Sequence, residues 1–120
     1  MKDFRQLKVW DKAHRLALAS YRATVTFPPD ERFGLTSQIR RCSSSVAANI
    51  AEACGRDGDG DFCRFLQVAM GSTELDYHWL LAHDLGFIEH APYEAMVEQI
   101  VEVKSMLAPL IRKVQSDRKG

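Results

Sequence analysis

The sequence predicts an all-α fold, an antiparallel up-and-down four-helix bundle in one domain over residues 1–120. Apolar residues recur at spacings of three and four along most of the chain, the periodicity of helices that bury one face. No stretch alternates apolar and polar residues as a half-buried strand does. Prolines and glycines divide the chain into four long segments with short connections, an arrangement typical of such a bundle.

The first predicted helix covers about residues 7–26 and ends at Phe27-Pro28-Pro29, because a residue that precedes proline is driven out of helical geometry. The second covers about residues 34–55, and Gly55 suits its C-terminal cap. Alternating steps of four and three, typical of a helix packed nearly parallel to its neighbours, separate its seam positions. These positions are Leu35, Ile39, Cys42, Val46, Asn49 and Ala53.

The third predicted helix covers about residues 60–85 as one continuous segment. An aspartate of the Asp-Gly sequence at 57–61 can cap its start, and Gly86 follows its end. The fourth covers about residues 91–116, and Pro92 in its first turn costs no hydrogen bond. Pro109 lies inside this last helix, where we expect it to kink the helix or to break it about one turn earlier.

Composition and charge restrict the class of protein. The 120 residues carry a formal net charge of zero, which argues against a protein that binds polyanions through bulk charge. The three cysteines form no CxxC pair and no secreted disulfide framework. The sequence opens without an apolar leader, and no stretch approaches the roughly 18 apolar residues of a membrane span. We therefore expect a soluble cytoplasmic protein with no membrane contact.

Basic residues form a stripe along the first predicted helix, with Tyr21 on the opposite, packed side. One narrow sector of a helical wheel contains Lys8, Lys12, Arg15 and Arg22. The second helix adds candidates for a second patch: Arg40, Arg41 and Arg56. Clustered Lys and Arg are what sequence-independent binding to nucleic-acid phosphates requires. The alternative is a solvated face, the common fate of charges on bundle helices.

An acidic stripe with a spacing of four runs along the fourth predicted helix: Glu94, Glu98 and Glu102. In a head-to-tail ring each subunit presents two different surfaces, so this stripe could face the basic stripe of the next subunit. The alternative is that acids early in a helix only complement its dipole.

Asn49 is a polar residue at a seam position, where an amide weakens packing unless it finds hydrogen-bond partners. We expect Asn49 and Glu52 to belong to a structural polar network. Glu52 and Arg56 are also spaced for an i,i+4 ion pair. The alternative is that Asn49 and Glu52 hold a guanidinium across a bundle or subunit boundary, that of Arg40 or Arg41.

Catalytic motifs are weak in this sequence. No Gly-rich phosphate loop or nucleophile elbow is present, and the histidines form no metal-ligand set. Glu74 and Asp76 suggest one enzymatic alternative, an α-helical nucleotide hydrolase that uses a divalent metal. Their spacing is a weak signal and is more typical of a solvated or inter-helix polar pair, so we expect no catalytic residues, no metal and no cofactor.

The order of several motifs resembles a known family. They are Leu7-Lys8-Val9-Trp10, Phe27-Pro28, Gly34-Leu35, Gln38-Ile39-Arg40-Arg41, Asn49-Ile50-Ala51-Glu52, Gly55-Arg56, Phe65-Leu66, Gly71-Ser72, Glu74-Leu75 and Leu85-Gly86. Over about residues 5–88 the chain resembles the bacterial S23-like proteins, four-helix bundles related to the product of the intervening sequence in some large-subunit ribosomal RNA genes. The accessory protein of diversity-generating retroelements is a more distant relative. Ala53 departs from the family pattern, which usually has glycine there.

The resemblance implies an antiparallel four-helix bundle that assembles as a homopentameric ring and has no established enzymatic activity. For the retroelement relative it implies binding of RNA and of a reverse transcriptase. Residues and resemblance together predict a non-enzymatic, ring-forming helical protein that binds or scaffolds RNA or a ribonucleoprotein. The metal-dependent hydrolase remains the alternative.

Overall fold

The structure, a computed structural model, describes residues 3–119 and the side chains of residues 3–118. Its long helices are α1 (Lys8–Ala23), α2 (Leu35–Cys54), α3 (Asp59–Ser72), α4 (Asp76–Asp84) and α5 (His90–Lys119). Short 3-10 segments cover Phe4–Gln6, Thr24–Thr26, Pro29–Glu31 and Thr73–Leu75. Among the described helices, none is long and apolar enough to cross a bilayer.

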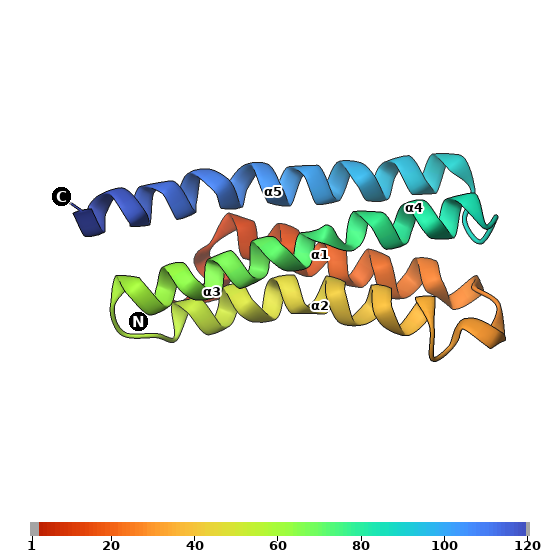
Figure 1. Ribbon diagram of the computed structural model, residues 1–120, viewed down its shortest axis with the longest axis horizontal. Coiled ribbons are helices and arrows are strands. Elements are labelled where there is room, and N and C mark those ends of the chain that lie inside the picture. Colours follow the sequence, from red (N-terminus) through yellow and green to blue (C-terminus); the bar gives the residue numbers. More distant parts are fainter. Residues whose placement is uncertain (1–2, 120) are drawn as a thin grey trace.

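The helices lie along the long axis of a body that measures 49 × 22 × 20 Å, and α4 continues the line of α3 (Figure 1). The chain reverses direction after α1, after α2 and after α4, so the predicted all-α, up-and-down four-helix bundle is confirmed. Helix α1 contacts α2 and α5, and α3 contacts the same two helices. The α1–α2 pair and the α4–α5 pair therefore form opposite faces of the bundle.

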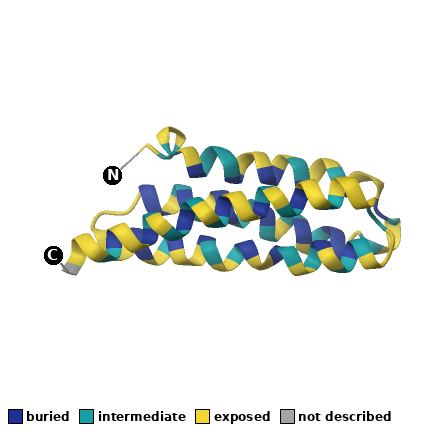
Figure 2. Cartoon of the chain, turned by 90° about the horizontal axis from the view of Figure 1, so that it is seen from above, coloured by how far each residue is buried: buried dark blue, intermediate teal, exposed yellow. Residues whose placement is uncertain are grey.

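The core is one cluster of buried apolar residues to which all five long helices contribute. Figure 2 shows buried positions recurring along each helix. Every helix contributes fully buried side chains, among them Leu16, Ile39, Ile50, Leu66, Trp79, Ile100 and Leu107. Each buried aliphatic side chain of this size contributes about 1.5–3 kcal/mol to folding. Two buried polar atoms, Ser20 Oγ and Trp79 Nε1, have no hydrogen-bond partner in the described part of the chain.

The third predicted helix is not continuous, and the expectation of one helix over about residues 60–85 is wrong in this respect. Helix α3 ends at Ser72, and the 3-10 segment Thr73–Leu75 separates it from α4. The fully buried Thr73 donates its hydroxyl hydrogen to the Met70 carbonyl. A hydroxyl that bonds a carbonyl of the preceding turn competes with the helical ladder, which favours the local change to 3-10 geometry.

Helix α5 passes Pro109 without a break, so the expected interruption one turn earlier is absent. Figure 1 shows it as one unbroken ribbon. Pro109 is exposed to solvent. Because proline has no N–H, the Ser105 carbonyl receives no helical hydrogen bond from position 109. The helix therefore tolerates the proline at a local cost in stability.

Candidate nucleic-acid interface

Two residues of the predicted basic stripe on α1 have carboxylate partners in the same chain. Lys12 Nζ lies 3.1 Å from Glu102 Oε1, an ion pair that joins α1 to α5. Arg15 Nε lies 2.9 Å from Asp11 Oδ2, one turn earlier on α1. A neighbouring carboxylate offsets the positive potential of each side chain, which makes both weaker candidates for phosphate contact.

The other two residues of that stripe lie at opposite ends of α1. Lys8 borders a shallow depression beside the first turn. Arg22 borders another at the end of the bundle, next to the turn between α4 and α5. Neither forms an ion pair with any carboxylate in residues 3–118. The stripe is thus interrupted at its middle and is not one continuous free surface.

Arg40 and Arg41 border a groove on the α1–α2 face. It encloses about 490 Å³ and is lined by basic, aromatic and hydroxyl side chains: Tyr21, Arg32, Phe33, Thr36, Ser37, Arg40, Arg41 and Ser44. We call it the arginine groove. Within the described residues its three arginines form no ion pair with a carboxylate. The groove therefore concentrates positive charge that the chain itself does not neutralise.

Arg40 is held in one orientation by the end of α1. Its Nε donates to Thr24 Oγ1 at 2.8 Å and its Nη2 donates to the Tyr21 carbonyl at 3.3 Å. The Thr24 hydroxyl in turn donates to the Ser20 carbonyl at 2.9 Å. The guanidinium also lies over the Tyr21 ring, with Cζ 5.0 Å from the ring centroid. Two N–H groups are used in these bonds, and the remaining donors of the fork can bind an anion.

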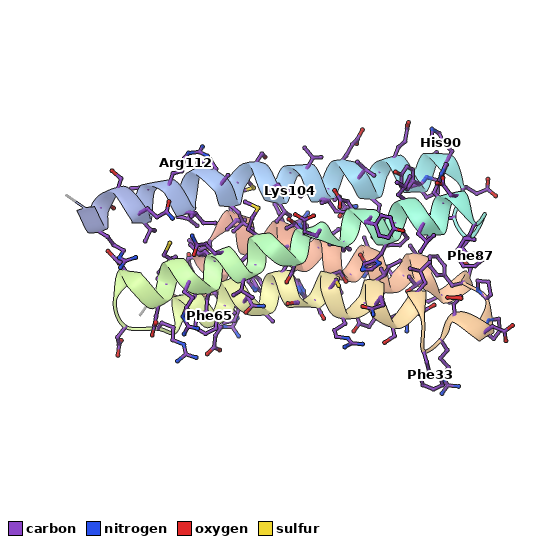
Figure 3. All side chains as sticks on the ribbon, viewed as in Figure 1. Phe33, Phe65, Phe87, His90, Lys104 and Arg112 are labelled. Carbon is purple, nitrogen blue, oxygen red and sulfur yellow. The ribbon has the colours of Figure 1, made fainter. Side chains whose placement is uncertain are left out.

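Arg32 and Phe33 come from the turn that leads into α2. The Phe33 side chain is 88% exposed and points away from the bundle (Figure 3). The Arg32 Cζ lies 5.3 Å from the centroid of the Phe33 ring. An aromatic side chain this exposed adds nothing to the core, whereas stacking on a planar partner would remove its apolar surface from water.

The carboxylate of Glu31, which precedes Arg32 in the sequence, accepts a backbone hydrogen bond at the start of α2. Glu31 Oε1 accepts a hydrogen bond of 3.2 Å from the Leu35 N–H and so caps the first turn. A Cβ at Gly34 would lie 2.9 Å from the same oxygen, so glycine makes room for the cap. The carboxylate thereby stabilises the helix start.

The three predicted acidic residues on α5 have different surroundings. Glu102 pairs with Lys12, as described above. Glu94 Oε1 lies 2.9 Å from His90 Nε2, at the end of a hydrogen-bonded chain in which His90 Nδ1 lies 3.1 Å from His83 Nε2. Glu98 is exposed beside Val97 and has no ion pair among the described residues. Within one chain the acidic stripe meets the basic stripe at a single point, Lys12.

The Asn49 amide belongs to a polar network, but not to the network predicted. Its Nδ2 donates to the Ser45 carbonyl at 2.8 Å and to Ser45 Oγ at 2.9 Å. Ser45 Oγ lies 2.9 Å from Ser72 Oγ, which links α2 to α3. Glu52 forms the predicted i,i+4 ion pair with Arg56, and no hydrogen bond joins it to Asn49 among the described residues. Arg40, held by Thr24 and Tyr21, is therefore not positioned by Asn49 or Glu52 within this chain.

Glu74 and Asp76, the two residues that suggested a metal-dependent hydrolase, do not form a metal site with each other. Asp76 Oδ2 lies 3.2 Å from Lys104 Nζ, an ion pair between α4 and α5 (Figure 3 labels Lys104), and Glu74 is exposed. Over residues 3–118, no three or more His, Cys, Asp or Glu side chains gather in a way that could hold a metal ion.

The family model of the 23S rRNA-intervening sequence protein matches residues 5–109. The chain belongs to this family. A crystal structure of a protein of unknown function from the S23 ribosomal protein family of Bacteroides thetaiotaomicron has 25% sequence identity to the chain and a TM-score of 0.80. The match covers 87% of this chain and 95% of that one. No protein with a curated description matches the chain. The predicted family is thus confirmed.

Among the groove residues that sequence reasoning missed are Tyr21, Arg32 and Phe33. Tyr21 was expected on the packed side of the first helix, but it is 45% exposed beneath Arg40. Arg32 and Phe33 lie in the short connection before α2, where helical periodicity gives no information. An available signal was the local sequence itself, since a basic residue next to an aromatic one in a turn is typical of surface recognition.

Proposed function

We propose that this chain is a non-enzymatic protein that assembles through its helical bundle into a ring-shaped homo-oligomer, expected to be a pentamer, and binds or scaffolds RNA in the cytoplasm. The observation that carries the RNA part is the arginine groove, with Arg32, Arg40 and Arg41 unpaired with carboxylates among the described residues.

Phosphate binding follows from the chemistry of the groove. Guanidinium groups donate paired hydrogen bonds to phosphate oxygens, and neutralised phosphates release counterions into solution. The chain's net charge of zero means that this affinity must come from local clustering of arginines rather than from bulk charge. Binding should therefore be moderate and steeply dependent on salt.

Ring assembly is supported by the opposite face of the bundle. Between α4 and α5, Tyr77, Leu80 and Val101 are 62%, 42% and 56% exposed. A pocket on this face is lined by Tyr77 and Leu80 from α4 and by Val97 from α5. An apolar surface of this kind, bordered by charged side chains, is typical of a protein interface. The pocket on the α4–α5 face shares no lining residue with the arginine groove.

The receiving surface in such a ring would be the outer side of α1. Leu18 in α1 is 39% exposed, Val25 in the 3-10 segment that follows α1 is 71% exposed, and Arg22 lies between them in the sequence. On the other face, Glu98 borders the apolar surface next to Val97. Apolar side chains with a base on one surface match apolar side chains with an acid on the other. Of the predicted contact between the basic and the acidic stripe we thus retain one pair: Arg22 of one subunit and Glu98 of the next.

RNA retention tests the proposal. The double variant Arg32→Ala, Arg41→Ala should bind RNA about 10-fold or more weakly at low salt, and the slope of log K against log salt should fall by about 0.7 per lost phosphate contact. The matched control is Arg15→Ala, Arg64→Ala, which removes two exposed arginines that already pair with Asp11 and Asp61. Fluorescence anisotropy measures the affinity, and light scattering measures the mass of the same sample.

Equal loss of affinity in both double variants would show that only net charge matters and would contradict a role for the groove. Absence of RNA binding by the natural chain at low salt would contradict the RNA proposal as a whole.

A further inference from the structure

We propose that the arginine groove binds a single-stranded segment of RNA, with an unpaired base stacked on Phe33 and the adjoining phosphates held by Arg40 and Arg41. This inference rests on the proposed function and adds to it the structural class of nucleic acid and the recognising side chains. It starts from the fact that Phe33 is 88% exposed beside three arginines that have no carboxylate partner among the described residues.

The exposed Phe33 ring offers a flat apolar surface beside the Arg32 guanidinium. The Arg32 guanidinium lies over one side of the Phe33 ring, with Cζ 5.3 Å from the centroid, so a base can stack on the other side of this largely exposed ring. Stacking of bases on aromatic rings and on guanidinium planes is the usual way in which proteins hold unpaired nucleotides. Bases inside a duplex are stacked on one another, and their faces are not available to Phe33.

Arg40 provides a preset phosphate contact deeper in the groove. The bonds from its side chain to Thr24 Oγ1 and to the Tyr21 carbonyl fix the guanidinium before any ligand arrives. A donor that is already oriented loses less entropy on binding than a free side chain does. Arg41 lies next to it, and its guanidinium forms no hydrogen bond or ion pair with the described residues, so it supplies a more adaptable second contact.

Hydroxyl groups complete the lining. Thr36, Ser37 and Ser44 border the same groove and can bond phosphate oxygens or the ribose 2′-hydroxyl. Ser44 Oγ now donates to the Arg41 carbonyl at 3.1 Å, a local bond that can be exchanged for a ligand. An aromatic ring, oriented guanidinium groups and hydroxyls in one groove fit a nucleotide unit better than they fit a simple anion.

The test compares two RNAs of equal length, one unstructured and one a perfect duplex, by fluorescence anisotropy at fixed salt. The natural protein should prefer the single strand. Phe33→Ala should weaken single-strand binding about 5- to 150-fold, the range for loss of one stacked base, and should leave duplex binding unchanged. Phe33→Tyr is the conservative control, because its ring still stacks, and it should retain the affinity.

Failure of this inference can be distinguished from failure of the proposed function. If Phe33→Ala binds the single strand as the natural chain does while Arg32→Ala, Arg41→Ala does not, the RNA proposal stands and the stacking inference is wrong. Equal affinity of the natural chain for duplex and single strand would also overturn it. Light scattering on Phe33→Ala excludes another role for the ring: a fall in oligomer mass would assign Phe33 to a subunit interface and overturn the inference.

Discussion

At the scale of the residue, the clearest anomaly in the core is the Ser20 hydroxyl, which is fully buried and has no hydrogen-bond partner among the described residues. A buried polar group without a partner costs free energy on folding, and alanine is a better helix former than serine. We predict that Ser20→Ala leaves the free energy of unfolding unchanged or raises it by about 1 kcal/mol, measured by urea denaturation.

Ser43→Ala is the matched control, since Ser43 is equally buried within α2 but donates to the Arg40 carbonyl at 3.1 Å. It should be the less stable of the two variants. A loss in Ser20→Ala as large as in Ser43→Ala would mean that the Ser20 hydroxyl is hydrogen-bonded in solution.

At the scale of the element, Pro109 interrupts the hydrogen bonding of α5. Its ring is exposed, and the missing N–H leaves the Ser105 carbonyl without its helical bond. We predict that Pro109→Ala raises the free energy of unfolding by about 1–3 kcal/mol, because it restores this bond and removes the ring. Thermal denaturation followed by circular dichroism at 222 nm measures the change.

Ser116→Ala, an exposed position later in α5, controls for helix propensity alone and should change stability by a few tenths of a kcal/mol. A Pro109→Ala variant no more stable than this control would indicate that the helix has adapted to the proline.

Elements also show what sequence can and cannot predict. Gly55 and Gly86 act on the residues next to them, so α2 and α4 end close to the predicted positions. Helix α1 ends at Ala23, earlier than predicted, because the chain continues up to Phe27-Pro28-Pro29 as the 3-10 segment Thr24–Thr26. The 3-10 segment at Thr73 depends on which rotamer its hydroxyl adopts, and no periodicity encodes that choice. Arg40 and Arg41 were found because clustered bases are visible in sequence. Tyr21 was expected to be packed and Lys12 to be free for a ligand. Both expectations failed because a helical wheel gives the direction of a side chain but not which residues of the neighbouring helices lie there.

At the scale of the whole molecule, the proposed ring places Arg22 of one subunit against Glu98 of the next. We predict that Arg22→Glu lowers the mass of the oligomer in solution and that the exchanged variant Arg22→Glu, Glu98→Arg recovers it, because opposite charges face each other again. Light scattering behind a sizing column measures both across a salt series. Glu102→Gln is the control, since Glu102 pairs with Lys12 in its own chain.

Full mass in Arg22→Glu would remove this pair from the interface, and a monomeric natural chain would contradict assembly altogether. If the oligomer keeps its mass at high salt, the apolar side chains of the α4–α5 face contribute most to assembly, because salt screens the charged pair.

The 3-10 segment between α3 and α4 has a geometric effect on that face. An α-helix turns 100° per residue and a 3-10 helix 120°, so the segment Thr73–Leu75 rotates α4 by roughly 60° relative to an uninterrupted α3. This angular offset determines which side chains of α4 point to the axis, as Trp79 does, and which point outward, as Tyr77 and Leu80 do. The buried Thr73 hydroxyl favours this 3-10 segment and thereby sets the rotation of α4 about its own axis. That rotation decides which side chains of α4 form the outer surface of the molecule.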